Sequence, residues 1–247
     1  MPVDRIWLDV TYEEKDTAKA AGARWDPDAR RWYAPRPGIA ALDPWLARPP
    51  LPELLPGEDR TLGCGLFVDL VPESCWFTNA RSCISTRDWQ RIQQMVLGRA
   101  GARCEVCGAT RDREQQRWLE VHERWTYDDD NLLQTLRRLI CLCTQCHQAT
   151  HFGLANVRGR ADQARAHLLT VTGMTDLQAR RHIDDAFTLW QQRSRRTWSL
   201  DLSILTNANI ALAAAPTAQG RPPAADRRRV RRGDAGCAAG RTGADRR

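Results

Sequence analysis

The sequence predicts an α+β protein with a small N-terminal α+β domain, a larger central domain with flanking helices, and a disordered C-terminal tail. Three observations support this division. A strand-like segment and a helix start lie near the N-terminus, two Cys-x-x-Cys pairs lie in the middle, and Ala, Pro, Gly and Arg dominate from about residue 206. The predicted boundaries are 1–48 for the N-terminal domain, 49–61 for a Pro-rich linker, 62–205 for the central domain and 206–247 for the tail.

The N-terminal domain is predicted to contain a strand, a helix and a hairpin. Residues 5–10 alternate like a strand, and Thr11 opens a capping-box pattern before a helix that reaches about Ala21. Two short strands around an Asp-Pro turn follow in residues 23–33. The whole unit resembles a small domain of unknown function that is attached to bacterial and phage nucleic-acid proteins.

The aromatic residues of this domain allow two interpretations. The hairpin side chains could stack on single-stranded bases; they are Arg24, Trp25, Arg31, Trp32 and Tyr33. Alternatively, Trp7, Trp25 and Trp32 form the small core. We favour the core, because eight basic and eight acidic residues in 1–48 leave no net charge to attract phosphate.

The central domain is expected to begin with a strand at residues 66–71 and a helix that starts at Ser85. Further helices are expected at residues 161–172 and from Thr175 onward. Residues 198–204 alternate like a strand, and we predict that they pair with residues 66–71. Three cysteines lack ligand spacing and are expected to be small core residues: Cys64, Cys75 and Cys83.

Two cysteine pairs predict a structural zinc site. Cys104 and Cys107 form one Cys-x-x-Cys, and Cys143 and Cys146 form another. Each pair can offer two thiolates from one tight turn, and two such turns complete a tetrahedral site. The alternatives are four scattered buried cysteines or a redox Cys-x-x-Cys protein. Both are disfavoured, because two such spacings rarely coincide by chance and no thioredoxin-like pattern surrounds them.

Three of the five histidines lie within residues 104–151, the stretch that begins with the first cysteine pair. His147 and His151 are four residues apart in a predicted helix, so they share one face, and His122 follows a strand-like segment. Three imidazoles with an open fourth position suit a catalytic metal. The alternative is that His147 and His151 only cap or pack a short helix. His167 and His182 lack partners in sequence and are expected to be surface or packing residues.

Residues 84–153 resemble the HNH nucleases of the ββα-metal (His-Me finger) class that carry a zinc knuckle. The resemblance implies a ββα-metal core in which His122, His147 and His151 hold the catalytic metal. It also implies that Glu120 supports the site. A structural Zn²⁺ and a second divalent ion, Mg²⁺, Mn²⁺ or Zn²⁺, are the implied cofactors.

The chain departs from that family pattern at two positions. Glu123 stands where the family has its general-base histidine, and Arg138 stands where it has an asparagine. The resemblance therefore implies a metal-dependent endonuclease acting on DNA, with Glu120, Glu123 and His122 as catalytic residues and Glu123 in the place of the base. The alternative is a catalytically degenerate, zinc-stabilised binding or adaptor protein.

Charge and composition give predictions for the C-terminal tail and for the cellular compartment. The net charge is +7, of which residues 216–247 contribute +6, so the rest of the chain is nearly neutral. Five arginines of this tail can bind phosphate backbones or form a solvated run without a role: Arg227, Arg228, Arg229, Arg231 and Arg232. Nine cysteines without a signal peptide indicate a reducing cytoplasm, and no apolar run is long enough to span a membrane.

Overall fold

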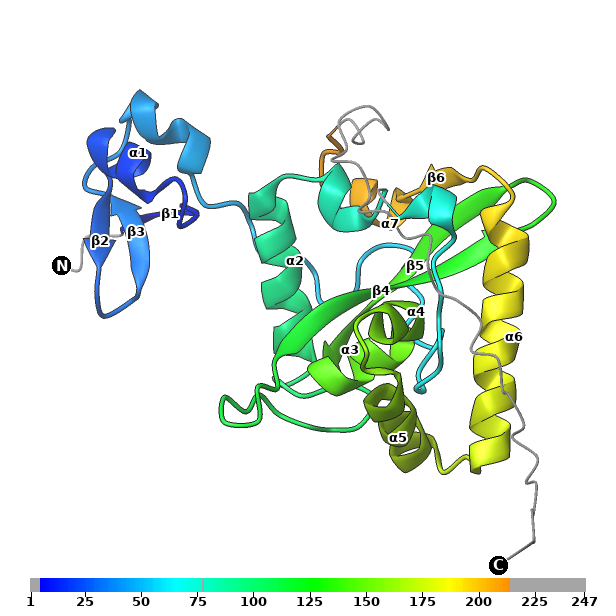
Figure 1. Ribbon diagram of the computed structural model, residues 1–247. Coiled ribbons are helices and arrows are strands. Elements are labelled where there is room, and N and C mark those ends of the chain that lie inside the picture. Colours follow the sequence, from blue (N-terminus) through cyan, green and yellow to red (C-terminus); the bar gives the residue numbers. More distant parts are fainter. Residues whose placement is uncertain (1–4, 77, 214–247) are drawn as a thin grey trace, which may run out of the picture. The chain divides into compact units, whose positions relative to one another are not determined.

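The computed structural model describes residues 5–76 and 78–213 and has the predicted α+β architecture (Figure 1). The described part contains two three-stranded sheets, one in the N-terminal domain and one in the central domain. The predicted tail arginines at 227–232 lie outside the described residues. Among the described residues, no helix has both the length and the apolar character needed to cross a membrane.

The N-terminal domain is an antiparallel sheet packed against short helices. Its strands β1 (Ile6–Leu8), β2 (Arg24–Asp26) and β3 (Arg31–Ala34) lie in the order β1-β3-β2, with α1 (Lys15–Ala20) and η1 (Ala40–Trp45) completing the unit. The predicted strand, helix and hairpin are thus confirmed. The turn of the hairpin forms because the Asp26 carboxylate accepts hydrogen bonds from two following backbone N–H groups.

The predicted aromatic core of this domain is only partly correct. The buried tryptophan is Trp45, which packs with Leu8 and Leu42. Trp32 packs partly against this core, but Trp25 is 49% exposed. Trp7 pairs with Tyr33 across the strands, on the opposite face from buried Leu8. Small residues of α1 and the sheet fill the core instead, which the aromatic pattern alone does not reveal.

The central domain is organised around a long hairpin, β4 (Leu119–Asp128) and β5 (Leu133–Cys143), with β6 (Ser199–Asp201) parallel to β5. A bulge interrupts the register beside Arg124, where Arg137 is the extra residue on β5. Because of it, Leu136 and Leu139 both face the same core although they are three residues apart.

Two hydrophobic cores lie on opposite faces of this hairpin. One contains residues of α2 (Thr86–Arg99) and α7 (Ser203–Thr206). The other contains residues of α3 (Thr144–Thr150), α4 (Phe152–Val157), α5 (Ala161–Thr172) and α6 (Asp176–Ser194). Two short 3-10 helices, η2 (Glu73–Cys75) and η3 (Ala80–Cys83), precede α2. In chain order β4, β5 and α3 form a ββα unit (Figure 1).

The predicted helix starts at Ser85 and Thr175 are confirmed. The Ser85 hydroxyl accepts a hydrogen bond from the Asp88 backbone N–H at the start of α2. Thr175 and Gln178 form a complete capping box at the start of α6. Gly173, with a φ of 71°, ends α5 in the left-handed conformation that glycine adopts readily.

Several flanking predictions need correction. Residues 66–71 form an extended loop, not a strand, and β6 pairs with β5 instead. The expected linker is partly structural, because Leu55 and Glu58 are buried. The expected tail begins later than residue 206, because Ile210 is buried and Leu212 forms a bridge to Ile84. Cys75 and Cys83 are buried as predicted, whereas Cys64 is exposed.

Candidate metal sites of the central domain

Four cysteine side chains meet at the junction of a loop, β5 and α3. The first pair lies in a tight turn in which Gly108 donates to the Cys104 carbonyl at 2.9 Å and adopts a φ of 73°. In the second pair, the Cys143 sulfur accepts from the Cys146 N–H at 3.5 Å and so caps α3. All four sulfur atoms lie within 4.8 Å of one another.

This arrangement fits a tetrahedral zinc ion. A tetrahedron with Zn–S bonds of about 2.3 Å separates its sulfurs by about 3.8 Å. The Cys107 and Cys143 sulfurs are 3.6 Å apart. Hydrogen bonds from Cys143 and Cys146 lower the pKa of Cys104, whereas the hydrogen bond to Cys104 raises the pKa of Cys143 to about 11. Four thiolates can coexist here only with a cation among them, so the cluster can bind a structural zinc.

One residue at this site was missed in the sequence. His167 on α5 places its Nε2 atom 3.2 Å from the Cys146 sulfur. A ring N–H donated to a ligand sulfur would stabilise the thiolate. His167 lies 21 residues from Cys146, and only the packing of α5 against α3 brings the two together. His182, also expected to lack partners, accepts a 2.9 Å hydrogen bond from the Val68 backbone N–H.

The three predicted histidines converge at a second cluster. His122 comes from β4, His147 from α3, and His151 from the residue that ends α3. Their ring centroids are 4.7 to 5.2 Å apart, and their candidate ligand nitrogens lie within 4.8 Å of one another. The four-residue spacing of His147 and His151 places both rings on the side of α3 that faces β4.

Burial keeps the imidazoles of His122 and His151 neutral, which is the form that binds metals. Burial lowers the pKa of His122 well below its ordinary value, and the charge of Arg124 lowers it further. Burial likewise lowers the pKa of His151 to about 3. The Arg124 guanidinium is itself buried and lies 3.4 Å from His122 Nε2. His122 and His151 can therefore each offer a nitrogen lone pair to a metal.

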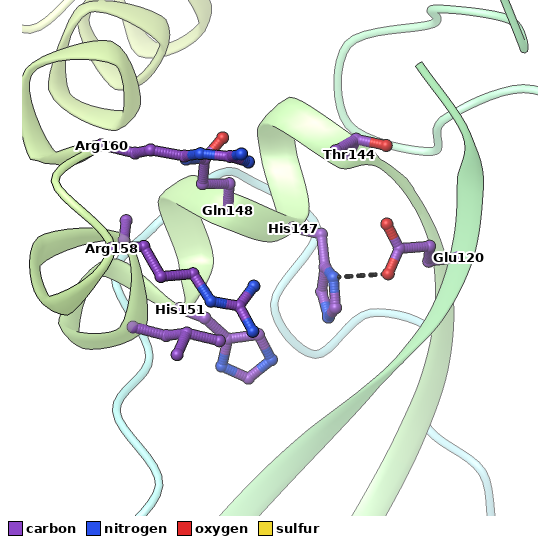
Figure 2. Close-up of a pocket in the computed structure, with 9 residues that line it drawn as sticks. Glu120, Thr144, His147, Gln148, His151, Arg158 and Arg160 are labelled. Carbon is purple, nitrogen blue, oxygen red and sulfur yellow. Dashed lines mark ion pairs between the residues drawn. The ribbon is translucent and has the colours of Figure 1, made fainter. Parts of the chain in front are cut away.

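Glu120 lies against this cluster. Its carboxylate accepts from His147 Nδ1 at 3.0 Å, as the dashed line in Figure 2 shows. That hydrogen bond lowers the pKa of Glu120 and leaves the other nitrogen of His147 as the ligand atom. A cavity of about 170 Å³ opens beside these residues and is also lined by Thr144, Gln148, Leu154, Ala155, Arg158 and Arg160.

Glu123, the residue predicted to replace the base, does not join the histidines. Glu123 lies opposite Leu139 in the hairpin. The Leu139 side chain belongs to the core that packs against α2. The half-buried side chain of Glu123 faces that core, and its carboxylate accepts a 2.8 Å hydrogen bond from the Ala80 backbone N–H. The pairing of β4 with β5 stays in register from His122 to Arg124, so His122 and Glu123 point to opposite faces of the hairpin. Glu123 is therefore a core residue by position.

Burial raises the pKa of Glu123 to about 7, so this residue should make stability depend on pH. Its folded pKa exceeds its unfolded value of 4.5, so the stabilisation is complete below about pH 4.5 and is lost as pH rises through 7. Glu123→Gln lacks this titration. From pH 5 to pH 8 we expect the variant to gain about 2.5 kcal/mol in unfolding free energy relative to wild type, measured by urea denaturation. Equal pH dependence of both proteins would contradict this placement.

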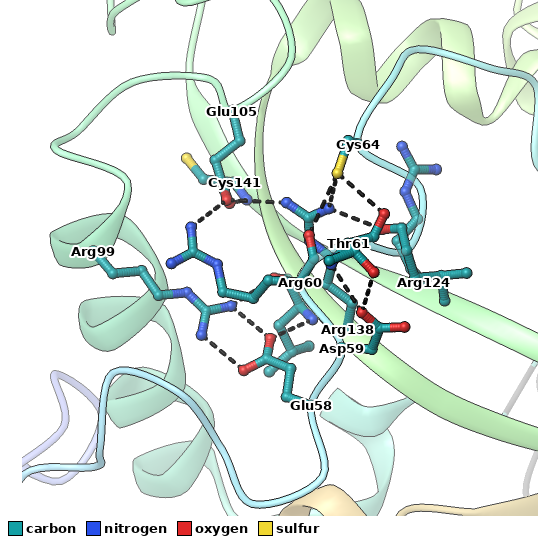
Figure 3. A network of polar contacts seen from close by, with 12 residues as sticks. Glu58, Asp59, Arg60, Thr61, Cys64, Arg99, Glu105, Arg124, Arg138 and Cys141 are labelled. Carbon is teal, nitrogen blue, oxygen red and sulfur yellow. Dashed lines mark hydrogen bonds and ion pairs between the residues drawn. The ribbon is translucent and has the colours of Figure 1, made fainter.

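Arg138, the second departure from the family pattern, lies in a buried polar network (Figure 3). It donates to Glu105 at 3.2 Å and to the Leu62 carbonyl at 2.8 Å. In the same network Glu58 and Arg99 form an ion pair of 2.6 Å, with side chains 0% and 1% exposed. Arg138 therefore holds the loop before residue 66 to the hairpin. Where the family pattern has an asparagine, this chain has an arginine with a structural role.

Comparison with protein families identifies the N-terminal domain. Residues 5–46 match a family described as a domain of unknown function, DUF5710. The chain is 48% identical over 44 residues to a DNA primase TraC of Escherichia coli, and 50% identical over 42 residues to a second protein of that name. These matches cover 17% of this chain but only 4% and 3% of those relatives. No solved structure matches the chain. Residues 5–46 are thus a DUF5710 domain, as the resemblance of this unit implied.

Proposed function

We propose that the protein is a metal-dependent endonuclease of the HNH type that hydrolyses DNA phosphodiester bonds. The observation that carries the proposal is the convergence of His122, His147 and His151 beside an open cavity. The three imidazoles would hold a divalent ion without adding negative charge that offsets its own. An ion held there would supply a Lewis acid for the developing charge on a phosphodiester.

The residues around the histidines have positioning roles in this proposal. The Glu120 carboxylate accepts a hydrogen bond from His147 Nδ1. This contact fixes the His147 ring with its other nitrogen toward the ligand position. Arg124 lies beside His122 and favours its neutral form. Of the nine described residues that line the cavity, Glu120 carries the one carboxylate. Glu123 is dropped as the base, because it lies in the opposite core.

The choice of DNA as substrate rests on two similarities. The central domain resembles HNH nucleases over residues 84–153, and a short segment of the chain is similar to DNA primases. The second candidate function is a zinc-stabilised binding or adaptor protein without catalysis. The position of Glu123 favours that candidate, because Glu123 faces the opposite core and cannot act in place of the family's general-base histidine.

Supercoiled plasmid nicking by the purified full chain tests the proposal. We expect cleavage that requires an added divalent ion, measured across Mg²⁺, Mn²⁺ and Zn²⁺. Glu120→Gln should lower the rate about 10–100-fold, because it loosens a ligand's orientation. His147→Ala removes the ligand itself and should lower the rate further. Glu123→Gln is the matched control and should cleave at the wild-type rate.

Two results would contradict the proposed nuclease site. Cleavage that survives His147→Ala would show a contaminant or another site. If wild type binds DNA but cleaves with none of the three metals, the adaptor function replaces the nuclease.

A further inference from the structure

Two arginines at the cavity beside the histidines have no acidic partner among the residues that the structure describes. Arg158 and Arg160 line the cavity and are both exposed. The ion pairs found in the described part of the chain include neither of them. In Figure 2 the Arg158 guanidinium points toward His151, whereas the Arg160 guanidinium lies beside Gln148. Both charges therefore remain available to a bound molecule.

The local sequence explains why these charges are unpaired. Residues 143–161 contain no Asp or Glu, so α3, α4 and the turn that follows offer no carboxylate. The one carboxylate that lines the cavity, on Glu120, is already bonded to His147. Gly159, with a φ of 69°, ends α4 and turns the chain between the two arginines. The Arg158 and Arg160 side chains thus line one cavity, from the two sides of Gly159.

We propose that Arg158 and Arg160 bind phosphate groups of a polynucleotide backbone, Arg158 at the phosphate being hydrolysed and Arg160 at a neighbouring one. This inference rests on the proposed function for its assignment of the reacting phosphate. A guanidinium presents paired N–H donors that match phosphate oxygens, and it cannot be deprotonated at neutral pH. The cavity lining carries two unpaired arginines and one carboxylate, which is already hydrogen-bonded to His147, so it favours an anion over a neutral or cationic ligand.

Binding can be measured separately from cleavage. In the His147→Ala background, which keeps the four cysteines, a fluorescein-labelled DNA duplex is titrated with full-length protein at several salt concentrations. Each of Arg158→Ala and Arg160→Ala should lower the slope of log K against log salt by about 0.9, the value for one phosphate contact. Arg181→Ala, an exposed arginine of α6 outside the cavity, is the matched control and should leave the slope unchanged.

Cleavage by the otherwise wild-type protein distinguishes the two arginines. Arg158→Ala should lower kcat about 10²-fold, as loss of a transition-state donor does, while Arg160→Ala should mainly raise KM. Arg160→Lys should restore the salt slope, because it keeps the charge.

The outcomes for the two proposals are separable. If no metal supports cleavage but both alanine variants still lose salt slope, the phosphate-binding residues stand and the nuclease fails. If wild type cleaves and both variants bind and cleave like Arg181→Ala, the phosphate-binding inference is overturned while the nuclease stands.

Discussion

Cys146→Ser is expected to prevent the central domain from folding. The Cys146 side chain is fully buried and belongs to the core that α3 shares with β5 and α5. Structural zinc sites contribute about 10–16 kcal/mol of apparent binding free energy. That range reaches or exceeds the whole stability of a typical domain, about 5–15 kcal/mol. The variant should accumulate as insoluble or protease-sensitive protein, and a strong chelator should have the same effect on wild type.

The measurements are elemental analysis, limited proteolysis and thermal unfolding. Cys64→Ser is the matched control, because Cys64 is exposed and lies outside the four-sulfur cluster. We expect one tightly held zinc per chain in wild type and in Cys64→Ser. A soluble, protease-resistant Cys146→Ser protein, or wild type with less than one zinc per chain, would contradict the structural zinc site.

The second large effect is expected at the buried ion pair of Glu58 and Arg99. Glu58→Gln leaves the Arg99 guanidinium without a counter-charge, and breaking such a pair costs about 3–5 kcal/mol. Burial alone would raise the pKa of Glu58, but the hydrogen bonds from Arg99 and the Leu139 N–H more than offset this and lower it. The pair's contribution is thus present at neutral pH and is lost as pH falls through the lowered pKa.

Urea denaturation at neutral pH measures this loss. Glu53→Gln, an exposed glutamate five residues earlier, is the control and should change stability by less than about 0.5 kcal/mol. Replacing Glu58 and Arg99 together with leucine should recover much of the loss, because no charge is then left buried. A Glu58→Gln variant as stable as Glu53→Gln would show that the pair contributes nothing.

Local signals predicted the parts of the fold that short segments determine. The caps at Ser85 and Thr175 and the two Cys-x-x-Cys turns depend on side chains within a few residues of one another. The histidine cluster was also predictable, because residue spacing on α3 and the family resemblance both point to it. The predicted strand at residues 66–71 was wrong, because alternating apolar residues fit an extended loop that packs on a core equally well.

Long-range packing decided the rest. The linker prediction failed because proline content does not reveal that Leu55 and Glu58 fill a core made by distant residues. The position of Glu123 depends on whether β4 bends after His122, and the bulge lies instead beside Arg124. The Arg158–Gly159–Arg160 segment carried one available signal, two basic residues shortly after His151 in a stretch, residues 143–161, without Asp or Glu.

The short helix α3 carries groups from both clusters. Cys146 and His147 are adjacent in sequence, so one turn of backbone orients a zinc thiolate on one side and an imidazole on the other. If both clusters hold metal, their loading has an order. We expect the thiolate cluster to fill first, because Cys143 caps α3 and Cys146 lies within it, and α3 sets the histidine geometry. A mutation that shifts the first cluster would therefore damage the second without touching any of its ligands.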